Sequence, residues 1–429
     1  MPNGANYIHK QLRYELENYI KSQYFGKSPL LLSAISKHID DEGLLYQKPF
    51  IESSPAYVTI KNGLQKANID KWLKKFFLEL SDAGIGVFPS PFAHQIKALE
   101  NAVAGKDLFV STGTGSGKTE CFMWPILAKL ASEAKVSQES WKKRGVRTVI
   151  MYPMNALVSD QVGRLRRMIG DHENKFINIF RKNCGEDSRR PQFGMYTGRT
   201  PYPGLEPNTK EDRALENTLA RMSFPQTDSE KEFYNKLLKE GKIPAKSDMA
   251  QFLEGLHNSR HIPNAEDAEL ITRFEMQQFC PDILITNYSM LEYMLLRPRE
   301  KKIWDDTKEW LASNKENKLM FVIDEAHMYR GSAGGEVALL IRRLFNKLGI
   351  SRDRVQFILT TASMPNQNDE DKKAVMQFAN DLSASDTETE FVFLTGDRET
   401  IEGKLKYDID VHHLLGTNAN DFEDKEEKN

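Results

Sequence analysis

Residues 107–134 constrain the fold most, because they join a short apolar strand to a helix through a glycine-rich turn. The strand candidate DLFVST runs into Gly113, Gly115 and Gly117, and the helical pattern KTECFMWPILAKLASEA starts at Lys118. Glycines let a backbone curl so that its N–H groups point inward, and the start of a helix adds a partial positive charge. Such a strand–loop–helix unit is the context of a phosphate-binding loop, or P-loop.

The residue types in this loop predict roles toward a bound nucleotide and its metal. Lys118 supplies a mobile cation for the β- and γ-phosphates, and the Thr119 hydroxyl is placed to ligate Mg²⁺. Thr112 stands where the usual pattern G-x-x-x-x-G-K-[ST] has its first glycine. We expect the nucleotide to contact the whole loop: Thr112, Gly113, Thr114, Gly115, Ser116, Gly117, Lys118 and Thr119.

A second half-site is predicted by KLMFVIDEAH (318–327), an apolar strand that ends in acidic residues. A carboxylate at the end of a buried strand can hold Mg²⁺, which assigns Asp324 to the metal. The adjacent Glu325 can orient or deprotonate an attacking water. An acidic surface turn after a core strand is the alternative, and the P-loop upstream argues against it. The predicted catalytic residues are Glu325, Lys118 and Asp324.

Strands alternate with helices along the chain, which predicts an α/β fold with a parallel, doubly wound sheet. Further strands are predicted at 147–153, 192–198, 355–363 and 390–396, a strand followed by a helix within 281–296, and helices at 7–26, 28–39, 69–80 and 156–170. Charged helical stretches near 210–222, 229–240 and 247–257 predict an inserted helical lobe at about 199–275. We expect three parts: a helical accessory segment (1–85), an α/β lobe (86–385) and an acidic tail (386–429).

Composition narrows the class of protein. The formal net charge of −2 excludes an overall basic nucleic-acid binder but leaves local patches open. The three cysteines form no C-x-x-C pair, which suggests neither a zinc site nor a disulfide framework. No apolar run approaches the ~18–20 residues that cross a membrane, and the N-terminus does not read as a signal peptide. The expected location is the cytoplasm.

The P-loop followed by Asp324-Glu325-Ala326-His327 resembles a superfamily 2 helicase of the DExH/DEAH kind. Other motifs of that superfamily follow in order: FPSPFAHQIKALE around Gln95 resembles the Q motif, YPMNALVSDQ (152–161) motif Ia, ITNYSMLEYML (285–295) motif Ib, and TTASMP (360–365) motif III. In motif III the usual Ser-Ala-Thr stands here as Thr361-Ala362-Ser363.

This resemblance implies a RecA-like P-loop NTPase lobe that uses ATP and Mg²⁺. It implies that Gln95 reads adenine and that His327 links the γ-phosphate site to motif III. It also implies that motifs Ia and Ib grip the backbone of one nucleic-acid strand, expected to be single-stranded DNA, without reading sequence. The residues that match are Pro153, Asn155, Thr286, Asn287 and, after the DEAH motif, Arg330.

Several stretches, among them YTGRTPYPG and DEAHMYRGSAGGEVALLIRRL, resemble the large bacterial helicases of phage defence, of the Druantia and DISARM types. This implies other defence proteins as partners. Helicases of this superfamily complete the ATP site with an arginine finger from a second RecA-like lobe. Residues 366–429 hold no Q-x-x-G-R-x-x-R-like stretch. We therefore expect ATP binding with slow turnover until a second lobe is supplied.

Residues 161–200 carry nine Lys/Arg against four acids, a local excess that predicts either a nucleic-acid surface or a solvated face. Tyr196 and Tyr202 are candidates to stack on bases, with a strand-core role as the alternative for Tyr196. His94, His257 and His261 have no other metal-ligating residues near them at the spacing of a metal site, so we assign them no metal. A nucleotide-switched docking module without unwinding is the alternative function. A transporter-type ATPase would leave the Q motif and YPMNAL unexplained.

Overall fold

The computed structural model describes residues 5–39, 41, 43–46, 56–113, 115–202, 209–362, 369–385 and 390–399. The chain divides into two compact units, one of residues 1–56 with 399–429 and one of residues 57–398. Among the described residues, no helix combines the length and the apolar character that crossing a bilayer requires.

The described part of the first unit is a helical hairpin. It consists of α1 (Ala5–Ile20), a π-helical turn η1 (Lys21–Phe25) and α2 (Pro29–His38), which confirms the helices predicted over 7–26 and 28–39. Pro29 is the first residue of α2, where its missing N–H costs no helical hydrogen bond. Apolar residues such as Leu12 and Leu30 are exposed along both helices.

The second unit is built on one eight-stranded sheet in the order β4-β3-β5-β2-β6-β7-β1-β8, and each pair of adjacent strands is parallel. The predicted parallel sheet is confirmed. Because all strands run the same way, their carboxyl ends meet at one edge of the sheet. The strands are β1 (Asp107–Ser111), β2 (Thr148–Tyr152), β3 (Phe193–Tyr196), β4 (Glu269–Leu270), β5 (Ile283–Asn287), β6 (Leu319–Ile323), β7 (Val355–Thr361) and β8 (Phe391–Thr395).

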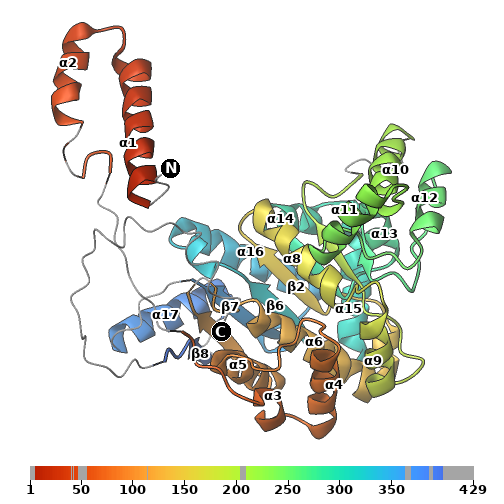
Figure 1. The fold of residues 1–429 in the computed structure, drawn as a ribbon. Helices are drawn as coiled ribbons and strands as arrows, with labels where there is room; N and C mark the ends of the chain where they lie inside the picture. Colours follow the sequence, from red (N-terminus) through yellow and green to blue (C-terminus); the bar gives the residue numbers. More distant parts are fainter. Residues whose placement is uncertain are drawn as a thin grey trace. The chain divides into compact units, whose positions relative to one another are not determined.

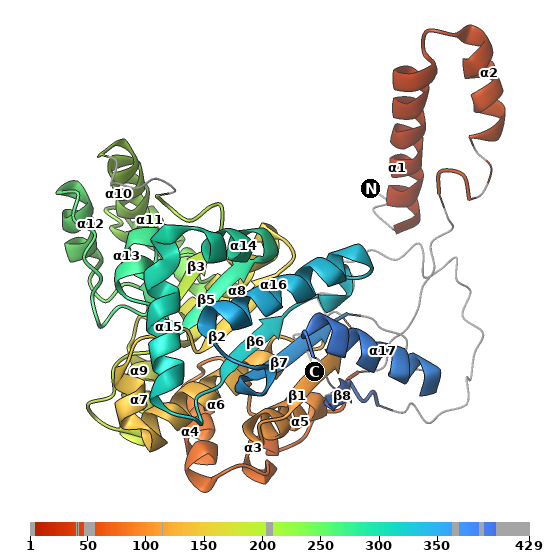
Figure 2. The ribbon, with the colours of Figure 1, turned by 180° about the vertical axis from the view of Figure 1, so that it is seen from behind.

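Alternate strand residues pack into two separate cores, which makes the sheet doubly wound. On β2, Ile150 and Tyr152 join one core, while Val149 and Met151 join the other. Figure 1 and Figure 2 show helices on both faces of the sheet. The first core takes α3 (Gly63–Lys66), α4 (Lys71–Asp82), α5 (Ala93–Val103), α6 (Glu120–Val136), α7 (Gln138–Lys142), α8 (Asn155–Met168) and α9 (Lys175–Cys184). The second takes α13 (Arg273–Gln278), α14 (Tyr288–Leu296), α15 (Lys301–Ser313), α16 (Ser332–Leu348) and α17 (Asp369–Leu382).

Two segments that we grouped with the accessory helices and the tail lie in this second unit. Helix α4 buries Leu73, Phe76, Phe77 and Leu80 in the first core. Strand β8 pairs along its length with β1. The second unit also contains three short 3-10 turns among its described residues: η2 (Pro298–Glu300), η3 (Ala326–Met328) and η4 (Arg352–Arg354).

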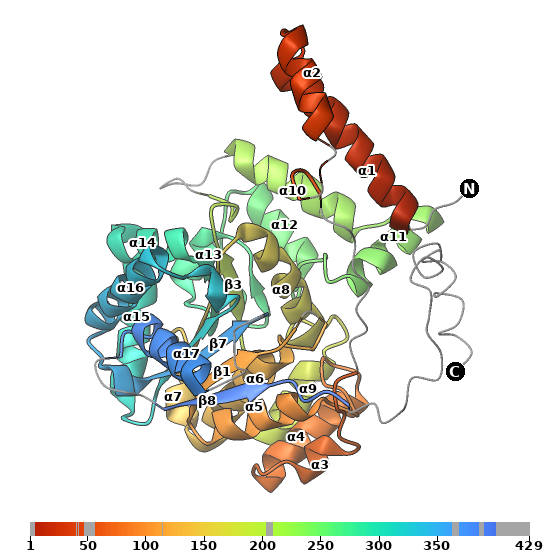
Figure 3. The same ribbon diagram turned by 90° about the vertical axis from the view of Figure 1, so that its left-hand side faces the viewer.

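The predicted insert contains α10 (Thr209–Ser223), α11 (Asp228–Lys239) and α12 (Met249–His257), after which β4 returns to the sheet beside β3. Figure 3 shows α10 and α12 side by side, and they share a small core around Leu219, Leu253 and Leu256. The insert is tied to α8, because Arg166 donates two hydrogen bonds of 2.7 Å to the Glu269 carboxylate.

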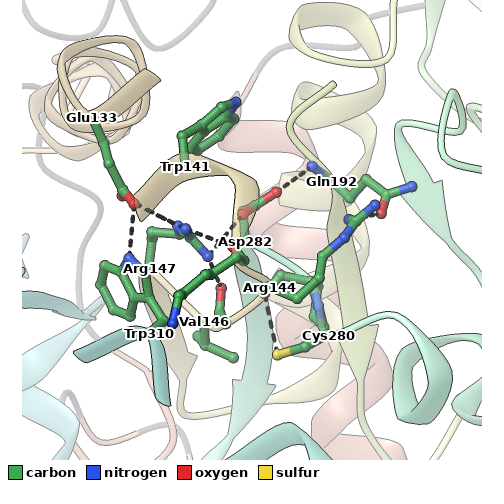
Figure 4. A network of polar contacts seen from close by, with 12 residues as sticks. Glu133, Trp141, Arg144, Val146, Arg147, Gln192, Cys280, Asp282 and Trp310 are labelled. Carbon is green, nitrogen blue, oxygen red and sulfur yellow. Dashed lines mark hydrogen bonds and ion pairs between the residues drawn. The ribbon is translucent and has the colours of Figure 1, made fainter. Parts of the chain in front are cut away.

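A buried ion-pair network stands at the amino ends of β2 and β5, opposite the strand ends that carry the predicted site. Figure 4 shows Arg147 between Glu133, Trp310 and Asp282. Arg147 Nη2 donates to Glu133 Oε1 at 2.9 Å, and its Nη1 lies 3.4 Å from Asp282 Oδ1. The Trp310 indole N–H donates to the same Glu133 oxygen at 2.7 Å. The network thus joins α6, the starts of β2 and β5, and α15.

Candidate functional site

The P-loop follows β1 as predicted and is closed by its own hydroxyls. The Ser116 hydroxyl donates to Thr112 Oγ1 at 2.7 Å, and both side chains are buried. The Thr112 N–H donates to the carbonyl of Thr361 on β7 at 3.2 Å. Threonine at the first position of the pattern therefore has a structural use that glycine could not serve. Both side chains hold the loop from inside, which leaves only their backbone for a nucleotide.

Two glycines give the loop its curl. Gly115 and Gly117 adopt φ values of 74° and 68°, in the left-handed region that L-residues rarely enter. A Cβ on Gly117 would also collide with the amide nitrogen of Gln95. Thr114, the remaining predicted loop contact, lies outside the described residues.

Gln95 and His94 brace the loop from α5. Gln95 Oε1 accepts from the Phe92 N–H at 2.9 Å, and its Nε2 donates to the Gly117 carbonyl at 3.1 Å. His94 Nε2 lies 2.7 Å from the Ser116 carbonyl, and burial lowers the pKa of the His94 imidazole, so that a neutral ring donates from Nε2. His94 has no role assigned from the sequence, and its place next to Gln95 is the available signal.

The acidic strand end meets the P-loop. Lys118 Nζ lies 3.1 Å from Glu325 Oε1, across 207 residues of sequence. Asp324 is buried, and its Oδ1 accepts from the Glu325 N–H at 3.0 Å and from the Thr360 hydroxyl. Burial raises the pKa of Asp324, against the Thr360 hydrogen bond, which favours the charged form. The two predicted half-sites therefore form one site.

His327 connects this site to motif III. Its Nδ1 lies 3.0 Å from Thr361 Oγ1 at the end of β7 and 3.3 Å from Glu325 Oε2. Glu325 itself has φ 51°, a left-handed conformation unusual for a residue with a side chain. This bend directly precedes the 3-10 turn that carries His327. Ser363 of motif III lies outside the described residues.

The donor set fits a nucleoside triphosphate with Mg²⁺. Thr119 is the N-cap of α6, so the loop ends at the positive end of a 17-residue helix. Oxygen ligands suit Mg²⁺, and those that would hold it are the Thr119 hydroxyl and the Asp324 carboxylate. Bound there, the metal would neutralise charge that develops on the phosphates.

The predicted nucleic-acid residues separate into two groups. Asn155, which begins α8, and Asn287, at the end of β5, meet: Asn287 Nδ2 donates to Asn155 Oδ1 at 2.6 Å. Pro153 is half-buried just before α8, and Arg330 is exposed after the acidic strand end. Thr286 is fully buried, and its hydroxyl donates to the Tyr196 carbonyl at 2.8 Å. The structure therefore does not support a direct strand contact by the Thr286 side chain.

The basic excess in residues 161–200 is largely neutralised by acids from elsewhere in the chain. Ion pairs to acids outside the segment are Arg164–Asp160, Arg164–Glu120, Arg166–Glu269, Arg181–Glu266, Lys182–Glu79 and Arg189–Asp282, while Lys175 pairs with Glu173 inside it. A local count of charges could not show this, because most of these carboxylates lie 44 to 103 residues away. Most cations of this segment are therefore paired with carboxylates of the fold, which lowers the net charge that the segment presents.

The tyrosines proposed for base stacking are core residues. Tyr196 is fully buried and its hydroxyl donates to Glu300 Oε1 at 2.6 Å. Tyr202 is also buried and its hydroxyl donates to Asp212. The core alternative for Tyr196 is confirmed, and a stacking role for Tyr202 is wrong.

The sequence of the chain matches a known protein family. Residues 92–201 and 245–371, more than half of the chain, match the family model described as DEAD/DEAH box helicase. The chain belongs to the DEAD/DEAH box helicase family. The match includes Gln95, the P-loop, the strand-end asparagines and the acidic motif. It omits residues 202–244, so α10 and α11 of this helicase lobe are additions to the family pattern.

Individual relatives agree with the family. The helicase lobe is 39% identical to the Druantia protein DruE of Escherichia coli (strain UMEA 4076-1), over 98% of this chain and 24% of that protein. It is 23% identical to an uncharacterised ATP-dependent helicase of Methanocaldococcus jannaschii, over 64% of this chain and 26% of that protein. The chain thus spans about a quarter of the length of these curated relatives. Among solved structures, the DUF1998 helicase MrfA bound to DNA and AMPPNP is 17% identical over 85% of this chain and 33% of that one, with a TM-score of 0.40.

Proposed function

We propose that this chain is the ATP-binding lobe of a DNA helicase or translocase that serves a bacterial anti-phage defence system in the cytoplasm. The observation that carries the proposal is the 3.1 Å contact between Lys118 Nζ and Glu325 Oε1, which joins the P-loop to the acidic strand end. The similarity to the Druantia protein DruE supports the defence role.

Each site residue takes a part in this proposal. Lys118 and the loop amides bind the β- and γ-phosphates, Thr119 and Asp324 hold Mg²⁺, and Glu325 orients and deprotonates the attacking water. Gln95 carries adenine recognition in addition to bracing the loop. His327 relays the state of the γ-phosphate to Thr361 through their 3.0 Å contact.

Asn155 and Asn287 are proposed to bind the backbone of single-stranded DNA, with Pro153 shaping the turn before α8 and Arg330 adding a cation. Backbone contacts of this kind fix the position of a strand without reading its sequence. A second RecA-like lobe is proposed to close over the nucleotide and supply an arginine finger. In related phosphoryl-transfer enzymes such an arginine raises the rate ~10³–10⁵-fold.

Calorimetry with a non-hydrolysable ATP analogue and Mg²⁺ tests the ATP site on the chain as it stands. We expect binding by the wild-type chain, its loss in Lys118→Ala, and loss of the Mg²⁺ requirement in Asp324→Asn. No heat from the wild-type chain, with its fold confirmed by circular dichroism, would refute the site.

Turnover after addition of a second lobe, taken from the longer relative DruE, tests the helicase role. We expect single-stranded DNA to stimulate ATP hydrolysis. The double variant Asn155→Ala with Asn287→Ala should abolish this stimulation. ATP hydrolysis that neither DNA nor RNA stimulates would instead favour the nucleotide-switched docking module.

A further inference from the structure

Three segments far apart in sequence converge beside the P-loop. Residues 57–60 lie between the turn that enters α5 and the chain that leaves β8. The Val58 N–H donates to the Asp397 carbonyl at 2.9 Å, and the Ala93 N–H donates to the Val58 carbonyl at 2.9 Å. The segment before the helicase motifs and the segment after β8 are thereby held in one small sheet-like layer.

Tyr57 is the side chain that this layer presents to the P-loop. Its phenol oxygen accepts a hydrogen bond of 3.1 Å from the N–H of Gly113, the loop residue that follows Thr112. The ring packs edge-on against Phe92 and His94, with centroids 5.7 and 5.5 Å apart. A Cβ on Gly396 would collide with the same ring. The phenol is therefore fixed by close packing on several sides.

Arg398 completes the contact from the exit of β8. Its guanidinium carbon lies 4.9 Å from the centre of the Tyr57 ring, and its Nη2 lies 3.4 Å from the phenol oxygen. A cation over an aromatic face and a donor to its hydroxyl both favour one position of that ring. The neighbouring Asp397 is anchored in turn by an ion pair of 2.9 Å with Lys97 on α5.

We propose that Tyr57 and Arg398 are positioning residues of the ATP site, which anchor the start of the P-loop to the segment that leaves β8. This inference rests on the proposed ATP site and adds to it a coupling between nucleotide and residues 397–398. A triphosphate that orders the loop also orders its anchor, and the anchor in place favours the nucleotide-binding form of the loop. Such coupling is reciprocal by thermodynamic necessity.

The affinity for Mg²⁺ and a non-hydrolysable ATP analogue gives the first test. Tyr57→Phe keeps the ring and removes only the acceptor for Gly113, so we expect binding about 2- to 10-fold weaker, the value of one hydrogen bond. Tyr234→Phe, which removes a phenol hydroxyl from α11 of the insert, is the matched control and should bind as the wild type does. Arg398→Ala should weaken binding less, and the double variant should lose less than the sum of both, because Arg398 acts through the phenol.

Hydrogen exchange followed by mass spectrometry measures how nucleotide binding changes the exchange rate of each peptide. If Tyr57 only stabilised the fold, its replacement by Phe would not remove this nucleotide-dependent change. In the wild-type chain the analogue should slow exchange in peptides that contain Val58 and residues 390–399; in Tyr57→Phe at a saturating concentration that slowing should disappear. Unchanged exchange in these peptides when the wild type binds, or equal slowing in Tyr57→Phe, would overturn the inference. Lys118→Ala separates the two proposals: if the wild type binds no better than this variant, the ATP site itself has failed.

Discussion

At the residue scale, Glu325 is proposed to serve two purposes. It pairs with Lys118 at 3.1 Å, and it is assigned the activation of water. Glu325→Gln keeps an oxygen acceptor for Lys118 but cannot take a proton. We expect analogue affinity within a few-fold of the wild type and a fall in single-turnover hydrolysis of ~10²–10⁴-fold, the usual contribution of a general base. Single-turnover hydrolysis as fast as that of the wild type would remove Glu325 from the chemistry.

The Thr112–Ser116 hydrogen bond explains a departure from the usual loop pattern and makes a separate prediction. Thr112→Val keeps the shape of the side chain and leaves the Ser116 hydroxyl without its 2.7 Å partner. Loss of one hydrogen bond should weaken analogue binding about 2- to 10-fold. Ser116→Ala should have a similar effect, and the double variant should be no worse than either single one. Calorimetric affinities for the three variants check this, and fully additive losses would contradict it.

At the element scale, the network around Arg147 holds two strand starts and two helices at the edge of the sheet away from the ATP site. Asp282 accepts from Arg189 at 2.6 and 2.7 Å and from the Gln192 N–H at 2.9 Å. Burial alone would raise the pKa of Asp282, but Arg189 and Arg147 together hold it below its ordinary value. Asp282→Asn leaves buried arginines with one carboxylate fewer. The expected loss in the free energy of unfolding at pH 7 is ~3–5 kcal/mol.

The pH dependence of that loss follows from the sign of the shift. A carboxyl whose pKa is lower in the folded than in the unfolded chain stabilises above its ordinary pKa, and the gain disappears as the pH falls through the folded value. The wild type and Asp282→Asn should therefore converge in acid. Urea unfolding at a series of pH values measures this, with Asp305→Asn as a control at an exposed aspartate of α15. A difference that grows toward low pH would contradict the assignment.

Local pattern predicted the elements that build the sheet, and long-range contacts decided the rest. The apolar runs that contain Phe109, Ile150 and Phe321 became buried strands of one sheet, because the pattern of each run is a local property. The roles of Tyr57 and His94 were missed, since each depends on a partner at least 22 residues away. The assignment of β8 to the tail failed for a similar reason: only its pairing with β1 places it in the sheet.

At the scale of the whole molecule, carboxylates of the fold offset much of the positive charge that residues 161–200 could offer to a phosphate backbone. The net charge is −2, and most of these basic residues have carboxylate partners. Affinity for single strands falls with salt in proportion to the phosphates neutralised, with a slope of ~0.7 for each contact. A surface that used this whole segment would give a steep slope.

We therefore expect this chain to bind a single-stranded oligonucleotide with a shallow salt dependence, of slope about 2 or less. Arg181→Ala with Lys182→Ala should leave the affinity nearly unchanged, because both side chains already pair with Glu266 and Glu79. Asn155→Ala should weaken binding at every salt concentration without changing the slope, because an amide adds no charge. Fluorescence anisotropy of a labelled oligonucleotide measures both the affinity and its salt dependence. The salt concentration should span roughly 50 to 300 mM, on either side of physiological ionic strength. A steep slope that the Arg181 and Lys182 changes reduce would restore residues 161–200 as the binding surface.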